Sequence, residues 1–168
     1  YTTLFRSFYP LPTPVITGDQ TICNGETSTL NAGSGYINYT WSDGTTNQFN
    51  NATASNLYIV TVTDSNNCVG TSPPFSLTVL FGHANISYTS PIEFCEGGSV
   101  TLISDSALSY LWSDGSTGSS IIVNETGQYL VTVIDLNGCP AISSIVTTQE
   151  QENPELSILT DSILVCGE

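Results

Sequence analysis

The sequence predicts an all-β protein, and three observations lead to this prediction. Along residues 57–63, β-branched and aromatic residues alternate so that Tyr58, Val60 and Val62 share one face, which is the period-2 pattern of a half-buried strand. Pairs such as Asp43-Gly44, typical of tight turns, separate such stretches. No segment has a helical period, and the helix formers Lys and Met are absent from the composition.

The two halves of the chain repeat each other. The same spacing of 71 positions separates three pairs of residues, Trp41 and Trp112, Tyr58 and Tyr129, and Cys68 and Cys139. Cys166 lies the same distance beyond Cys95. We therefore expect the end of a preceding unit or a connector at 1–13, full repeats at 14–82 and 83–150, and the incomplete start of a third repeat at 151–168. A two-domain protein with ragged ends is the alternative.

Within each repeat, the alternation and the turn residues predict short strands. In the first repeat they are expected at 28–30, 38–42, 57–63 and 76–80, and in the second at 100–103, 110–113, 120–123, 129–134 and 143–148. About seven short strands in about 71 residues describe a small sandwich of two sheets. The predicted fold is therefore a tandem series of immunoglobulin-like β-sandwich repeats of about 71 residues, each with one disulfide.

Four aromatic residues are expected to fill the cores of these sandwiches. Trp41 and Trp112 lie mid-strand, where an indole packs between sheets; stacking on a ligand is the alternative. Tyr58 and Tyr129 begin the clearest alternating strands. Residues 127–129, Gly-Gln-Tyr, also resemble the tyrosine corner of immunoglobulin-like folds, in which the Tyr hydroxyl bonds to a nearby backbone group.

The cysteine spacing predicts one disulfide in each repeat. Cys23 and Cys68 are 45 positions apart and Cys95 and Cys139 are 44 apart, and we expect each pair at one pole of its sandwich. Closing a loop of about 45 residues stabilises a domain by roughly 4 kcal/mol in the chain-entropy model. Cys166 is expected to be unpaired within the chain and to bond a cysteine beyond its end. Disulfides indicate an oxidising, extracellular location.

The charge excludes two classes of partner. One Arg and no Lys stand against 15 Asp and Glu residues, for a net charge of −14. Nucleic-acid binding requires Lys and Arg to displace counterions from phosphates, and anionic membranes attract basic segments, so neither partner is expected. No apolar run reaches the about 18 residues of a transmembrane helix, so we expect no direct membrane insertion.

The repeated pattern resembles a known class of repeats. After Cys-x-Gly it reads Tyr-x-Trp-Ser-Asp-Gly at 39–44 and 110–115, and Tyr-x-Val-Thr-Val-x-Asp at 58–64 and 129–135, before the next Cys. It is similar to the immunoglobulin-like and PKD-like repeats of giant secreted surface proteins of the Bacteroidota, of which SprB-type gliding-motility adhesins are the best-known example. The resemblance covers nearly the whole chain. It implies export by the type IX secretion system and display at the bacterial cell surface.

Few residues suggest site chemistry. His83 is the only histidine, and the sequence has no nucleophile elbow, phosphate loop or zinc-protease motif, so an enzyme is not expected. No Cys-x-x-Cys pair exists to hold a metal. Calcium is the one cofactor considered, because Asp43, Asp64, Asp114 and Asp135 recur at matched positions and carboxylate oxygens suit this ion. The alternative is that these aspartates cap turns.

Two serines are candidates for modification. The sequences Asp-Ser-Ala at 105–107 and Asp-Ser-Ile at 161–163 resemble the Asp-Ser/Thr-aliphatic acceptor used for O-glycans in the Bacteroidota. Ser106 and Ser162 are therefore the expected glycosylation sites.

The expected function is non-catalytic: a structural and adhesive series of repeats that forms an extended filament or stalk, with neighbouring repeats as its partners. Two alternatives from other classes remain open. One is a self-assembling extracellular fibre subunit whose end segment adds as a strand to a neighbouring chain. The other is a module that binds surface glycans through loops at one pole of each sandwich.

Overall fold

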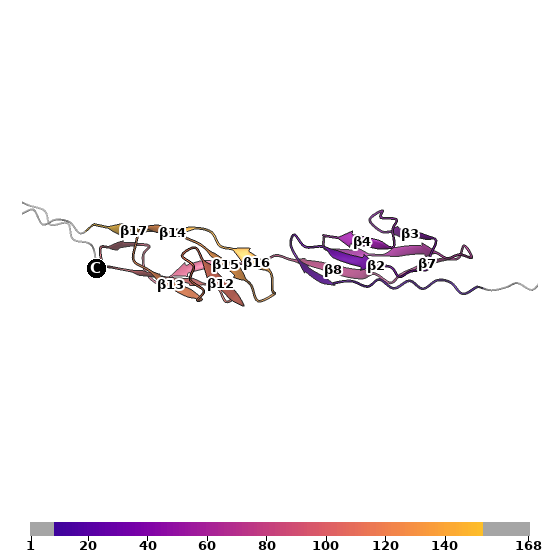
Figure 1. Cartoon of the computed structure of the whole chain (residues 1–168), viewed down its shortest axis with the longest axis horizontal. Coiled ribbons are helices and arrows are strands. Elements are labelled where there is room, and N and C mark those ends of the chain that lie inside the picture. The colour runs from indigo at the N-terminus through magenta and orange to yellow at the C-terminus, as the bar shows by residue number, and fades with distance from the viewer. Residues whose placement is uncertain (1–8, 153–168) are drawn as a thin grey trace, which may run out of the picture. The chain divides into compact units, whose positions relative to one another are not determined.

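The computed structural model describes residues 9–152 and divides the chain into two compact units, residues 1–80 (unit 1) and residues 81–168 (unit 2). The division falls after Leu80, two residues before the boundary expected from the sequence. Every regular element in the described residues is a β-strand, as the sequence predicts (Figure 1).

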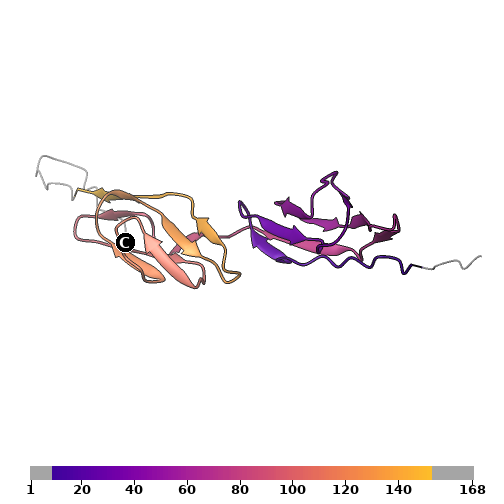
Figure 2. The same ribbon diagram turned by 45° about the vertical axis from the view of Figure 1, so that its right-hand side comes forward.

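Unit 1 contains eight strands in its described part. They are β1 (Thr21–Cys23), β2 (Ser28–Asn31), β3 (Asn38–Trp41), β4 (Phe49–Ala52), β5 (Asn56–Tyr58), β6 (Val60–Thr63), β7 (Val69–Thr71) and β8 (Phe75–Leu80). β2 pairs with β4, and β6 lies between β3 and β7, all antiparallel. β8 pairs in parallel with β1 and antiparallel with β5. Figure 2 shows these strands, from indigo to magenta, as two layers.

Unit 2 repeats this arrangement and adds one edge strand. Its elements are β9 (Ile86–Tyr88), β10 (Glu93–Cys95), β11 (Val100–Ser104), β12 (Ser109–Trp112), β13 (Ser120–Val123), β14 (Gly127–Tyr129), β15 (Val131–Ile134), β16 (Pro140–Ile142) and β17 (Val146–Gln151). The strand orders are β13-β11-β9, β12-β15-β16 and β10-β17-β14. β10, the strand that follows the added edge strand β9, pairs in parallel with β17, the last strand of unit 2, just as β1 pairs with β8 in unit 1.

A tryptophan lies in the core of each unit. Trp41 and Trp112 are each 2% exposed. The Trp41 Nε1–H donates to the Asn47 carbonyl and the Trp112 Nε1–H to the Gly118 carbonyl, both at 2.8 Å. Around each indole pack the inward side chains of facing strands, including Leu30, Ala52, Val60 and Val62 in unit 1 and Leu102, Val123, Val131 and Val133 in unit 2. This burial favours the packing role over stacking on a ligand.

The strand expected at 57–63 is divided because its hydrogen bonds change partner at Ile59. The Ser42 hydroxyl accepts the Ile59 N–H at 3.2 Å, and the Ser72 hydroxyl accepts the Val60 N–H at 3.1 Å. The N–H groups of both serines bond back to the same two residues. β5 is thereby free to pair with β8 while β6 pairs with β3 and β7. In unit 2 the same exchange involves four residues, Ser113, Ser143, Leu130 and Val131.

The tyrosine corner lies in unit 1 rather than in unit 2, where the sequence suggested it. The Tyr58 hydroxyl donates to the Ala54 carbonyl at 3.1 Å, and Tyr58 is 4% exposed. Tyr129 is only half-buried, and its ring lies over Gly127, where an added Cβ would come within 3.0 Å of it. Burial, with the nearby charge of Glu125, raises the pKa of Tyr129.

Candidate functional site at the cysteine turns

Cys68 lies at the end of a turn that Asp64 organises. Asp64 Oδ1 accepts hydrogen bonds from the backbone N–H groups of Asn66 and Cys68, both at 2.8 Å. The Asp64 N–H donates to the Cys68 carbonyl at 3.0 Å, and Asn67 has a positive φ of 60°. This Asx turn holds both the N–H and the carbonyl of Cys68 in place.

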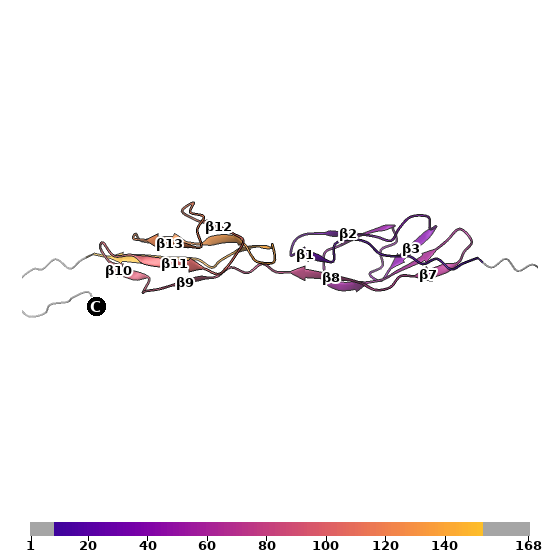
Figure 3. The same ribbon diagram turned by 90° about the horizontal axis from the view of Figure 1, so that it is seen from below.

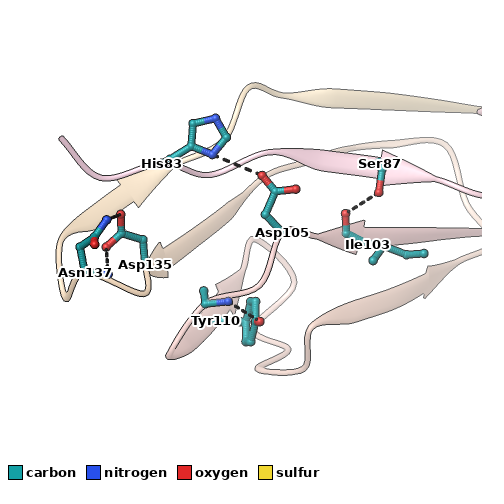
Figure 4. A network of polar contacts seen from close by, with 8 residues as sticks. His83, Ser87, Ile103, Asp105, Tyr110, Asp135 and Asn137 are labelled. Carbon is teal, nitrogen blue, oxygen red and sulfur yellow. Dashed lines mark hydrogen bonds and ion pairs between the residues drawn. The ribbon is translucent and has the colours of Figure 1, made fainter.

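Unit 2 builds the same turn around Asp135. Asp135 Oδ1 accepts the N–H groups of Asn137 and Cys139, both at 2.9 Å, and Gly138 takes the positive-φ position at 84°. The Cys139 N–H is the main cause that lowers the pKa of Asp135 below its ordinary value; burial opposes it, and the Asn137 and His83 backbones add to the lowering. Figure 4 shows the Asp135 carboxylate facing Asn137.

The first cysteine of each unit lies in a different kind of turn. Cys23 ends β1, where its carbonyl accepts the Glu26 N–H at 3.0 Å and its N–H donates to Glu26 Oε2 at 2.8 Å. Gly25 within this turn has a φ of 91°, a conformation that favours glycine. Cys95 ends β10 in an equivalent turn, with its carbonyl accepting the Gly98 N–H at 2.8 Å.

The two cysteines of a unit lie at opposite poles. β1 and β8 lie side by side (Figure 3). They are parallel, so Cys23 lies beside Leu80, the end of the last strand of unit 1. β5 is antiparallel to β8 and β6 continues it, so the turn with Cys68 lies at the other pole. About ten strand residues at about 3.3 Å each separate the two, on the order of 30 Å. The registers of unit 2 separate Cys95, beside Gln151, from Cys139 in the same way.

The chain enters each unit at the pole of its second cysteine. A Cβ on Gly70 in β7 would overlap the Pro12 carbonyl, so the segment before β1 runs against β7 close to Cys68. In unit 2 a Cβ on Gly82 would overlap the Pro140 carbonyl, next to Cys139. We call this end the N-terminal pole and the end at Leu80 or Gln151 the C-terminal pole. Pro12, within the stretch 1–13, therefore packs on unit 1.

The predicted disulfides Cys23–Cys68 and Cys95–Cys139 are wrong. Cys68 is a free cysteine, whereas Cys23, Cys95 and Cys139 are disulfide-bonded. Bonded cysteines have Cα atoms within roughly 7 Å of each other, which the opposite poles exclude within a unit. The prediction failed because it placed the end of the first strand beside the end of β6, whereas the parallel pairing places it beside the end of the last strand. Cys166 lies outside the described residues.

The four aspartates considered for calcium each lie in a turn of their own. Asp43 Oδ1 accepts the Thr45 N–H at 3.0 Å and its Oδ2 accepts Asn50 Nδ2 at 2.7 Å. Burial raises the pKa of Asp43, but these hydrogen bonds outweigh it and lower the pKa below its ordinary value. Asp114 is bonded similarly to Ser116. Within the described part of the chain, no three His, Cys, Asp or Glu side chains group as a metal site. All four carboxylates cap turns, and calcium binding stays a prediction.

Ser106 is exposed in the loop between β11 and β12, so its hydroxyl is open to modification. Its neighbour Asp105 lies 3.3 Å from Nδ1 of His83 (Figure 4). Both side chains are well exposed, so water screens the pair and its contribution to stability is small. Ser162 lies outside the described residues.

Comparisons with known proteins give the chain no family. No protein-family model and no curated protein matches the sequence. None of the described residues forms a helix long and apolar enough to span a bilayer.

The solved structures that are similar to the chain include the following three. The three N-terminal domains of the Highly Immunogenic Outer Capsid protein (Hoc) of bacteriophage RB49 match at 20% identity and a TM-score of 0.48, over 82% of this chain and 59% of theirs. Murine CEACAM1b matches at 9% identity and 0.35, over 83% and 99%. The fibronectin(III)-like modules of Clostridium thermocellum CbhA match at 11% and 0.36, over 88% and 100%. The chain thus spans 59% of the length of the Hoc structure.

Proposed function

We propose that the chain is a non-catalytic structural or adhesive segment of a large bacterial cell-surface protein of the gliding-motility adhesin type. In this proposal it consists of two tandem immunoglobulin-like repeats of about 71 residues within a longer series that forms a filament or stalk. The observation that carries the proposal is the course of the chain through the described part of each unit: the chain enters a unit at one pole and leaves it at the opposite pole. Domains of this kind can be joined end to end without a long crossover.

The polar anchors of the two units support a repeated design. The tryptophan Nε1 bond to a loop carbonyl, the serine pair at the divided strand and the aspartate turn before the second cysteine all occur in both units. These bonds involve residues at a spacing of 71 positions, such as Ser72 and Ser143. Unrelated sandwiches have no reason to keep such bonds at one spacing.

The composition supports a place outside the cell. Among residues 9–152, Cys23, Cys95 and Cys139 are disulfide-bonded, and disulfides persist in oxidising compartments. The net charge of −14 makes neighbouring repeats repel over a Debye length of about 8 Å at physiological salt. This repulsion opposes lateral association of strand edges.

O-glycans on the exposed Ser106 and calcium at the aspartate turns belong to the same proposal.

The experiment that tests the proposal uses the full-length secreted product. We expect many copies of this repeat in its sequence, and small-angle scattering whose maximum dimension grows linearly with the number of repeats. A compact particle would contradict the filament. A mature product of about the present length would instead favour the fibre subunit. Scattering and thermal unfolding repeated with and without Ca²⁺ test the aspartates, since an ion held at them would raise the melting temperature.

A further inference from the structure

The backbone of Cys68 is held by the same hydrogen bonds as the backbone of a cysteine that is bonded, Cys139. Its N–H donates to Asp64 Oδ1 at 2.8 Å, and the N–H of Cys139 donates to Asp135 Oδ1 at 2.9 Å. The carbonyls of the two cysteines accept the N–H of the same aspartates at 3.0 and 2.9 Å. In unit 2 this frame holds a disulfide, whereas in unit 1 it holds a free, half-exposed cysteine. The bonded copy indicates what chemistry the position serves.

Unit 1 itself offers no partner to Cys68. Cys23 lies at the opposite pole, on the order of 30 Å away by strand register, and is already disulfide-bonded. A partner for Cys68 therefore comes from outside the unit, at its N-terminal pole.

The course of the chain identifies the partner. The chain arrives at unit 1 at this same pole, where the Pro12 carbonyl packs against Gly70 in β7. A repeat that precedes unit 1 would therefore present its C-terminal pole here. In both described units that pole carries a cysteine in a Cys-x-Gly turn, Cys23 beside Leu80 and Cys95 beside Gln151. Both of these cysteines are disulfide-bonded.

We propose that Cys68 is a covalent docking site, which forms a disulfide with the Cys-x-Gly cysteine of a preceding copy of this repeat. The proposal rests on the proposed series of repeats and adds its linkage: a bond from the first cysteine of one repeat to the second cysteine of the next. The two poles are different surfaces, so the contact is head-to-tail and extends without closing into a dimer.

The bond forms by thiol–disulfide exchange. The partner cysteine first forms a mixed disulfide with a disulfide-bearing oxidant, such as a disulfide oxidoreductase. The Cys68 thiolate attacks the partner sulfur, the new S–S bond forms, and the oxidant leaves as a thiolate. Overall, two protein thiols lose two electrons and two protons, and the oxidant disulfide is reduced to a dithiol.

Peptide mapping of the secreted full-length product, alkylated and digested without reductant, tests this linkage. Because Arg6 is the only basic cleavage site, digestion at Asp, Glu or aromatic residues is required. We expect the Cys68 peptide joined to a Cys-x-Gly peptide from the preceding repeat. An alkylated Cys68, or its bond to a small thiol or to another Asp-turn cysteine, would overturn the proposal.

A Cys68→Ser variant should change the number of alkylatable thiols in opposite directions in the isolated chain and in the full-length product. In the isolated 168-residue chain, it should lose one alkylatable thiol relative to wild type. In the full-length product it should gain one, because the partner cysteine is released. Cys139→Ser is the matched control and should gain one thiol in both contexts, since Cys139 is bonded in this chain. A loss in the full-length product would overturn the linkage alone, whereas a product without a preceding repeat would overturn the proposed function as well.

Discussion

The first segments of units 1 and 2 meet their sheets differently. In unit 2 this segment forms β9, which pairs with β11 over three residues. In unit 1 the described part of this segment, from residue 9 on, makes an isolated bridge between Thr17 and Asn31 and no strand before β1. Pro14 precedes this bridge and Gly18 follows it, and proline has no N–H to donate to a strand ladder. The comparison teaches that single residues decide how far an edge strand extends, even where the surrounding sandwich is the same.

The two units also make room for the entering chain in opposite ways. In unit 1 the glycine is in the strand, where Gly70 faces the Pro12 carbonyl. In unit 2 the strand carries Ala141 and the glycine lies on the entering segment, where Gly82 faces Pro140. Both units thus keep a close contact between the entering segment and the strand, but the glycine that permits it lies in the strand in unit 1 and in the entering segment in unit 2.

The largest effect is expected from Trp41→Ala and Trp112→Ala, which test whether the units unfold independently. Each indole is 2% exposed, and truncation of a buried aromatic costs about 3–5 kcal/mol. Each variant should lose most of the stability of its own unit. The remaining tryptophan reports the other unit, whose denaturant transition by fluorescence should match wild type. A shift of that transition would show that the two units unfold together.

Gly70→Ala and Gly82→Ala should each destabilise their own unit by about 1–3 kcal/mol, because the added methyl overlaps a backbone carbonyl that has little room to move. Urea unfolding measures the loss. Ala141→Gly is the matched control: unit 2 already has its glycine at 82, so only the flexibility of an added glycine in a strand is expected, at most about 1 kcal/mol. If Gly70→Ala left the free energy of unfolding unchanged, the segment before β1 would not pack against β7.

Tyr58→Phe and Tyr129→Phe sharpen the difference between the two corners. Tyr58→Phe removes the hydrogen bond from the Tyr58 hydroxyl to the Ala54 carbonyl and should cost about 0.5–1.5 kcal/mol. Among residues 9–152, the Tyr129 hydroxyl makes no such bond, so Tyr129→Phe should change the unfolding free energy little. Equal losses in thermal unfolding would contradict the assignment of the corner to unit 1.

The smallest effect is expected at the positive-φ position of the cysteine turns. Asn67 has a φ of 60°, and Gly138 has 84° at the matching position. Because glycine adopts this region without a Cβ clash, Asn67→Gly should stabilise unit 1 by up to about 0.5 kcal/mol. Gly138→Asn should destabilise unit 2 by a similar amount. Opposite signs in equilibrium unfolding would show that the asparagine side chain contributes a bond of its own.

The all-β class and the longer strands could be predicted because their evidence is local. The alternation along 57–63 and the burial of Trp41 follow from residue type and period. The aspartate turns can also be predicted from the sequence, since Asp with Asn two residues later is typical of an Asx turn. Even there, the strand divides at Ile59, because two serines distant in sequence accept its hydrogen bonds.

The cysteine pairing could not be predicted, because it depends on a non-local choice. The three residues of β1, Thr21–Cys23, carry no period that indicates a parallel partner. Pairing with β8 rather than with an earlier strand moves Cys23 to the far pole. Ser143 was expected in a strand, but it is a buried loop residue whose hydroxyl accepts the Val131 N–H, and β17 begins only at Val146.

The parallel pairing of the first strand with the last also determines how a unit responds to tension. In unit 1 the Thr78 N–H donates to the Gln20 carbonyl at 2.9 Å and the Asn24 N–H to the Leu80 carbonyl at 2.8 Å. A pull on the two ends of the chain draws β1 toward its start and β8 toward its end. The hydrogen bonds between them are then loaded in shear and must rupture together, whereas bonds peeled from one end rupture one by one. In each sandwich the parallel pair of first and last strands, β1 with β8 and β10 with β17, therefore acts as a mechanical clamp that resists a pull along the strands.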